Sequence, residues 1–346
     1  MNQWAIKDFK NLGGLSSVTS GAPDDIFLVC ASFEPRSSVA RQYLAKSYRA
    51  KRGIIYVNKE FLNSSQNDTR KNLKRLKSIL RPRCDELVVA EGSWLDATQQ
   101  LASLKKVLLT KELRADKATS ITIDVTTFNR EALIVAIALL RSHLNSSTIR
   151  TVYVSPEDMG DWLSSGFRDI RNVIGFSGIQ NPSRPTSLVI LSGFEPERTS
   201  KIIEIHEPSK VFLGIGNPPT EEKFLPRNVL EQQKSALARQ DKLTLSRQKT
   251  LRFDFPANDI GACHIALEGL VSELVKESNV VLAPMSSKLS TLSAYLVAEH
   301  HPEVQITYCL PGQYNTKDYS KGAGHIFISQ LPDRTSPILI EANSSN

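Results

Sequence analysis

Two stretches of the sequence share one pattern and decide the fold: IFLVCASFEPRS at residues 26–37 and LVILSGFEPERT at residues 188–199. In each, an apolar run leads into a small residue, Phe-Glu-Pro, an arginine and a hydroxyl residue, with one extra residue in the second copy. A continuous apolar run, without alternation, is typical of a strand buried on both faces of a sheet. Self-similarity at a long period indicates an internal duplication.

Two further matches follow in the same order along each half. Residues 121–125 lead into two threonines, an arginine and an apolar helix, and residues 280–283 lead into two serines, a lysine and a second such helix. The next strands, 151–154 and 306–309, end in Tyr-x-x-Pro and are followed by LSSG and YSKG. Three matches in register indicate duplication, and the proline-rich segment 181–185 is the expected linker.

Strand-like runs alternate with helical patterns throughout, which predicts an α/β fold. We expect two tandem Rossmann-like, doubly wound units with mainly parallel sheets, related by internal duplication. Their expected bounds are 1–180 for the N-terminal half and 186–346 for the C-terminal half.

The composition is that of a globular protein, with 40% hydrophobic residues among 346. A net charge of +7 alongside 36 acidic residues favours anionic partners. No apolar run is long enough for a membrane span, so no membrane association is expected. Four scattered cysteines without a C-x-x-C pair favour a reducing, cytoplasmic setting. The histidines have no other potential metal-binding residues near them at a suitable spacing. We therefore expect structural roles for them, with no metal and no cofactor.

Ligands of open α/β sheets bind beyond the carboxyl ends of the strands. The two threonines at 126–127 could cap the helix that follows, whose first N–H groups would face a phosphate. The alternative is that the threonines only cap the helix and that the basic residue beside them faces solvent. The predicted ligand-binding residues are Ser32, Arg36, Thr126, Thr127, Arg130, Glu195, Arg198, Ser286, Ser287, Lys288, Tyr314 and Lys321.

Two acids are candidates for catalysis, Asp124 and Glu34. A carboxylate inside the apolar strand 121–125 must find partners or shift its pKa, although Asp124 could instead cap a neighbouring helix. Glu34 could hold a ribose hydroxyl or act as an acid or base, whereas a salt bridge within its loop, to Arg36, is the alternative. The same two interpretations hold for Glu195, with Arg198 as the salt-bridge partner.

A strongly basic helix is expected at residues 69–80, overlapping the positive segment Arg70–Arg83. Its leucines keep helical spacing, so one face is buried and the other is charged. A solvated face is the favoured interpretation, and nucleic-acid contact is the alternative.

The paired units resemble the CARF and SAVED sensor domains of prokaryotic defence systems. In each unit a strand is followed by two hydroxyl residues, a basic residue and a helix. The resemblance implies a cyclic oligonucleotide or related nucleotide held between the halves by Thr126, Thr127, Arg130, Ser286, Ser287 and Lys288. It also implies an effector protein as partner, because no nuclease, protease or membrane effector segment is evident in the sequence.

Three functions remain open from the sequence. The first is a nucleotide-binding sensor or regulatory subunit of a bacterial anti-phage defence or stress-response system. The second is a nucleotide-processing hydrolase using Asp124 and Glu34 as acid and base. The third is an assembly scaffold with a vestigial cleft, suggested because Ala283 stands near the position equivalent to Asp124.

Overall fold

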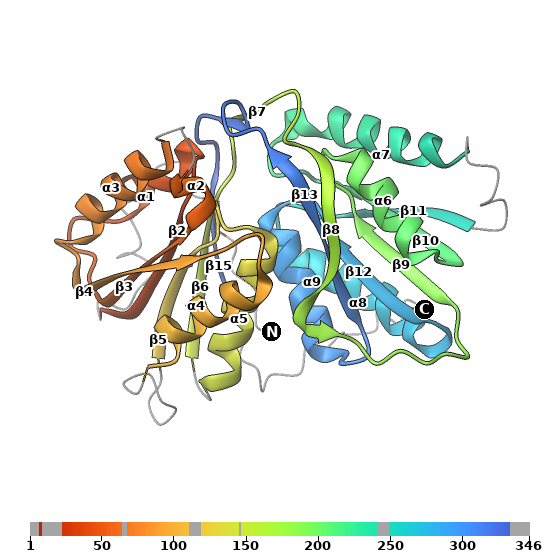
Figure 1. Ribbon diagram of the computed structural model, residues 1–346, viewed down its shortest axis with the longest axis horizontal. Helices are drawn as coiled ribbons and strands as arrows, with labels where there is room; N and C mark the ends of the chain where they lie inside the picture. The colour runs from red at the N-terminus through yellow and green to blue at the C-terminus, as the bar shows by residue number, and fades with distance from the viewer. Residues whose placement is uncertain are drawn as a thin grey trace, which may run out of the picture.

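The computed structural model describes residues 7–8, 23–63, 68–110, 119–144, 147–240 and 249–332. Two α/β units lie side by side, each built on its own sheet (Figure 1). Among the described residues, no helix is both long and apolar enough to cross a bilayer.

The first unit contains a seven-stranded sheet. Its order is β1 (Lys7–Asp8), β15 (Ile326–Gln330), β6 (Ser147–Val154), β5 (Thr119–Asp124), β2 (Asp24–Ala31), β3 (Ala50–Asn58) and β4 (Cys84–Gly92). The strands from β6 to β4 are parallel, and β15 joins β6 antiparallel.

The second unit contains a six-stranded sheet. Its order is β11 (Lys249–Phe255), β10 (Lys210–Gly216), β9 (Thr186–Leu191), β12 (Asn279–Pro284), β13 (Gln305–Tyr314) and β8 (Ser164–Ser177). Only β8 runs antiparallel within it. The five parallel strands therefore have one order in both units, with the first strand, β2 or β9, at the centre. This order is that of a Rossmann fold, so two duplicated Rossmann-like units are confirmed.

The units exchange their edge strands. β8 follows β6 along the chain but pairs with β13, and β15 follows β13 but pairs with β6. Between them, β7 (Asp158–Met159) and β14 (Ser320–Lys321) pair with one another in a small third sheet. Segment 181–185 thus separates the parallel strands of the two units along the chain. The edge strand β8 precedes this segment but belongs to the second sheet, and β15 follows it but belongs to the first. The domain bounds 1–180 and 186–346 stay a prediction.

Helices cover both sheets, as right-handed crossovers require. They are α1 (Ala40–Tyr43), α2 (Lys59–Asn63), α3 (Asp68–Leu80), α4 (Ala97–Leu108), α5 (Arg130–His143), α6 (Pro196–His206), α7 (Leu225–Gln240), α8 (Ile260–Glu277) and α9 (Lys288–His300). Helices α5 and α9 meet at the centre of the molecule (Figure 1). One apolar core runs through both units at this contact, with residues such as Leu133 and Leu292 fully buried.

Two ion pairs reinforce the contact between the units. Arg141 at the end of α5 donates to Glu299 of α9, with Nη2 2.7 Å from Oε2. Arg171 of β8 donates to Glu131 of α5 over 2.7 Å. The two sheets are therefore held in one arrangement by apolar packing and by buried charge.

Candidate ligand-binding cleft

Two adjoining cavities lie beyond the carboxyl ends of the central strands, between the units. The first has a volume of about 60 Å³ and the second about 30 Å³. Both are lined by Arg130, Lys288 and Tyr319. The small β7–β14 sheet contributes Met159 to the first cavity, and this sheet bridges the units beside the end of β13 (Figure 1). The cleft is therefore where the topology of an open α/β sheet places a ligand.

Two cations, one from each unit, begin the helices that meet at the cleft. Arg130 is the first residue of α5 and Lys288 the first of α9. Their caps are Asn129, which accepts from the N–H of Ala132, and Ser287, which accepts from the N–H of Ser290. Each cation thus stands at a helix end with positive dipole character. The suggestion that the threonines at 126–127 cap α5 is wrong, because the helix starts later, after Asn129.

Arg130 reaches across to the other unit. Its Nη2 donates to the backbone carbonyls of Met285 and Ser286, at 2.7 and 2.6 Å. Neither Arg130 nor Lys288 forms an ion pair with a carboxylate within the described part of the chain. Burial, together with the neighbouring Arg130 guanidinium, lowers the pKa of Lys288 to about 7. An anion in the cleft would relieve this like-charge repulsion.

Two buried Glu–Arg pairs flank these cations in equivalent positions. Glu34 pairs with Arg36, whose Nη1 also donates to the carbonyl of Val154 at 2.7 Å. Glu195 pairs with Arg198 at 2.6 Å, and Arg198 also donates to the carbonyl of Cys309. Val154 and Cys309 are matched positions of the repeat.

Each pair is completed by a serine from the exchanged segments. Ser320 donates to Glu34 at 2.8 Å, and Ser164 donates to Glu195. These serines occupy matched positions of the LSSG and YSKG motifs, whose glycines, Gly166 and Gly322, both have positive φ, 62° and 61°. The duplication therefore extends to individual hydrogen bonds. Both glutamates form the salt bridge that was the alternative to ligand binding. A role of either glutamate toward a ligand stays a prediction.

Asp124 lies below the cleft and lines neither cavity. Its carboxylate accepts from the Tyr43 hydroxyl and, at 2.9 Å, from the N–H of Thr126. Burial raises its pKa, against the lowering effect of the hydrogen bonds from Thr126 and Tyr43. This geometry favours holding the turn after β5; it does not cap a helix, and its catalytic role stays a prediction.

The two threonines after Asp124 link strands to one another. Thr126 accepts from the N–H of Val154 at 3.0 Å, and Thr127 donates to the carbonyl of Cys30 at 2.7 Å. Each still contributes to a cavity wall, Thr126 to the first and Thr127 to the second.

The other predicted site residues divide by position. The first cavity is lined by Arg36, Glu195, Ser286 and Ser287, and the second by Ser32, Glu34 and Tyr314. Arg198 lines neither cavity and acts through Glu195. Lys321 is exposed and pairs with Asp318 at 3.2 Å, away from both cavities.

An aromatic cluster surrounds the second cavity; sequence reasoning identified Tyr314 but missed Phe33, Phe61 and Trp94. Tyr314 lies 5.1 Å from the ring of Trp94 and 6.1 Å from that of Tyr319, centroid to centroid. Phe33 and Phe61 pack edge to face at 5.0 Å beside them. Trp94 follows the carboxyl end of β4, so the rule that indicated the other loops would have found it too.

Comparisons with known proteins find distant similarity to solved structures. No family model matches the sequence, and no curated protein matches it significantly. One similar solved structure is a type III CRISPR defence DNA nuclease activated by cyclic oligoadenylate, at a TM-score of 0.44 and 9% identity over 80% of this chain. The chain spans 64% of that nuclease's length. A structure of AtPrR2 with NADP+ and (+)pinoresinol has a TM-score of 0.21 and 10% identity, covering 81% of this chain and 88% of that one. At these values we take the function of the cleft from its own residues.

Proposed function

We propose that this protein is a nucleotide-binding sensor or regulatory subunit that holds an anionic ligand between its two units. The observation that carries the proposal is the meeting of Arg130 and Lys288, from opposite units, without a carboxylate partner in the described chain. Cations withdrawn from water are normally paired. Arg130 and Lys288 are both partly buried, so a site that leaves them facing one cleft is suited to an anion. A ligand bridging them would couple its binding to the relative position of the units.

The surroundings favour a nucleotide over a simple anion. Aromatic rings beside a cationic groove can stack on bases while the cations meet phosphate. Tyr319 lines both cavities and Tyr314 the second, so phosphate and base could be held side by side. The resemblance to CARF and SAVED domains, in bacterial defence or stress response, makes cyclic oligonucleotides the first ligand class to test.

The β7–β14 sheet controls the space that a ligand can fill. A cavity of about 60 Å³ has room for several waters or one phosphate group, but a whole oligonucleotide is larger. Because Met159 of β7 and Tyr319, which precedes β14, form part of the wall, we expect this sheet to move when such a ligand enters. Binding would then change a surface that an effector protein could contact.

Thermal unfolding with a ligand panel tests the proposal. Mono- and dinucleotides, cyclic oligoadenylates and inorganic phosphate are each added to the protein, because a ligand that binds the folded state raises its midpoint. We expect at least one nucleotide to raise the midpoint of the native chain but not of Arg130→Gln/Lys288→Met. Lys321→Met, which removes an exposed cation outside the cavities, is the control and should respond like the native chain.

Chromatography of the same mixtures separates the proposal from its alternatives. Intact ligand after long incubation supports a sensor, and turnover lost in Glu34→Gln supports the hydrolase. If nothing in the panel shifts the midpoint, the proposal fails in favour of a scaffold. The basic face of α3, where Lys74 and Arg75 are exposed, remains a candidate nucleic-acid contact.

A further inference from the structure

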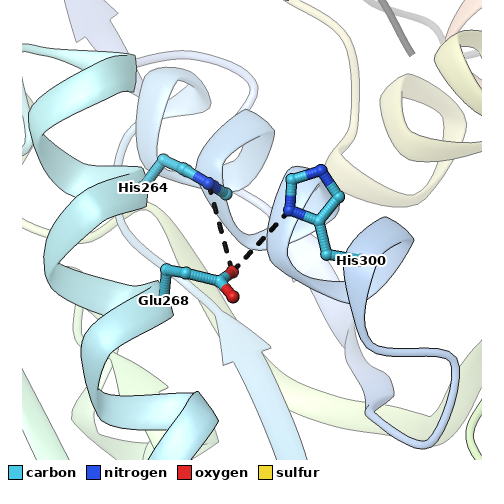
Figure 2. Close-up of side chains that lie close together, drawn as sticks. All are labelled: His264, Glu268 and His300. Carbon is cyan, nitrogen blue, oxygen red and sulfur yellow. Dashed lines mark ion pairs between the residues drawn. The ribbon is translucent and has the colours of Figure 1, made fainter. Parts of the chain in front are cut away.

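Three side chains gather where the first half of α8 packs against the last turn of α9. His264 and Glu268 lie one turn apart on α8, and His300 is the last residue of α9 (Figure 2). His264 Nε2 lies 4.0 Å from Glu268 Oε2, and His300 Nδ1 lies 3.9 Å from the same oxygen. One ligand atom from each residue lies within 4.8 Å of the other two.

The inward atoms of His264 and Glu268 have no partner within hydrogen-bond geometry among the residues that the structure describes. Both ring nitrogens of His264 and Oε2 of Glu268 are buried and unpaired, although the backbone of Ser293 lies near the His264 ring. His264 is fully buried. Unpaired buried polar groups are costly, and here two of them face each other across a distance too long for a hydrogen bond.

The other oxygen of Glu268 is held from outside the cluster. His301 Nε2 lies 2.6 Å from Oε1, and the Ser272 hydroxyl donates to Oε1 at 3.3 Å. Outer contacts of this kind orient a metal-ligating carboxylate and leave its second oxygen available.

We infer that His264, Glu268 and His300 bind a Zn²⁺ ion that ties α8 to α9. Two imidazoles and one carboxylate are a ligand set that suits Zn²⁺, whereas Mg²⁺ and Ca²⁺ prefer all-oxygen sites. Zinc–ligand bonds are about 2.0–2.2 Å long, so a small inward rotation of the three side chains closes the site. The fourth position belongs to water, since the His300 side chain is 31% exposed.

The ion has a structural role, independent of the cleft. Helix α9 runs from Lys288 at the cleft to His300, a rise of about 20 Å at 1.5 Å per residue. Glu299, next to His300, bonds Arg141 of the other unit. The ion therefore fixes the end of α9 beside the contact that holds the two units together.

This site is not evident in the sequence because its third residue, His300, is distant in the chain from the other two. The spacing of His264 and Glu268 places both on one face of a helix, but His300 joins them only through the packing of α8 against α9.

Metal content and calorimetry test the inference on the full chain. Any affinity tag is removed, the protein is treated with a chelator and dialysed, and Zn²⁺ is titrated. We expect one Zn²⁺ per chain and a higher unfolding midpoint with zinc. Glu268→Gln and His300→Ala should lose stoichiometric binding, and His301→Gln should weaken it by about 10- to 100-fold. His143→Ala, an exposed histidine at the end of α5, should bind like the native chain.

Cobalt substitution identifies the ligands without relying on stability. Co²⁺ should give visible absorption of a four-coordinate site without the near-ultraviolet band of a thiolate ligand, which excludes the four cysteines. Because His300 is partly exposed, His300→Ala should keep its circular dichroism while losing this spectrum. Absence of stoichiometric zinc, or an unchanged cobalt spectrum in His300→Ala and Glu268→Gln, would overturn the inference.

Discussion

At the scale of single residues, the charged side chains of the cleft fall into two kinds. Arg36 and Arg198 each have a glutamate, a backbone carbonyl and a serine from an exchanged segment around them. Arg130 donates to two backbone carbonyls. Neither Arg130 nor Lys288 has a carboxylate partner in the described chain. The first kind supports the loops, and the second kind is available to a ligand.

Removing one member of a compensated pair should destabilise the fold. Arg198→Met leaves Glu195 buried without its charge partner, which costs about 3–5 kcal/mol. Urea unfolding followed by circular dichroism measures the loss. Lys321→Met, which breaks an exposed pair, should change stability by less than about 1 kcal/mol. Equal stabilities of the two variants would contradict this account of the pair.

The pKa of Lys288 predicts how stability depends on pH. The unfolded chain keeps this lysine charged up to about pH 10, whereas the folded protein loses its proton above about pH 7. The unfolded state then binds more protons, so this residue makes the free energy of unfolding rise with pH between these values. The slope is at most about 1.4 kcal/mol per pH unit.

Lys288→Met should remove this rise. Urea unfolding at pH 7, 8 and 9 compares the variant with the native chain, and Lys321→Met serves as the control that keeps the native slope. A variant with the same slope as the native chain would show that Lys288 does not titrate in this range.

The element most directly tied to ligand entry is the β7–β14 sheet. It pairs only two residues from each strand, so little holds it in place apart from its neighbours. A Cβ at Gly160, next to β7, would overlap the carbonyl oxygen of Asp318. The close approach of these two backbones therefore requires glycine at this position.

Gly160→Ala should loosen this sheet and expose the cleft. We expect faster hydrogen exchange at the Gly160 N–H, which donates to the Tyr319 carbonyl at 3.2 Å, and a lower unfolding midpoint. Gly269→Ala is a matched control, because a Cβ there meets nothing within 4 Å. In its exposed helical position the alanine should stabilise by about 0.5–1 kcal/mol. Unchanged exchange in Gly160→Ala would indicate that the sheet does not depend on this contact.

At the scale of elements, the sequence predicted the strands that carry the buried apolar runs. The expected helix at 69–80 is α3. The apolar helices expected after the two threonines and after the two serines are α5 and α9. Strand β11 was missed because KTLRFDF alternates charged and apolar residues, as an edge strand does. The polar strand β8 was missed because its sequence contains no continuous apolar run. The cap of α5 was misplaced because the threonines face strands, which only tertiary packing decides.

The whole molecule is defined by the exchange of edge strands between its two units. Each sheet is complete only with a strand from beyond segment 181–185, and the Glu–Arg pairs are complete only with serines from the same exchanged segments. Pairing across long sequence distances cannot be seen in local patterns, so the sequence indicated duplication but not exchange. The convergence of Arg130 and Lys288 was predictable, because duplicated loops follow equivalent strands.

Separated halves should therefore not be stable monomers. A fragment of residues 1–180 lacks β15, which covers β6, and a fragment of residues 181–346 lacks β8, which covers β13. Expressed alone, each should aggregate or self-associate through its open edge, whereas co-expression should give one complex with the mass of the full chain. Gel filtration with light scattering measures this. A cooperatively folded monomer of either fragment would contradict the structural role of the exchange.

The central claim is that one anionic ligand bridges Arg130 and Lys288 between the units. Isothermal titration of the native chain with the nucleotide that raises its midpoint most tests this claim directly. The account predicts one ligand per chain and, in Arg130→Gln/Lys288→Met, an affinity lower by at least about 100-fold, equivalent to about 3 kcal/mol. Two ligands per chain, or an affinity that the double substitution leaves unchanged, would contradict it.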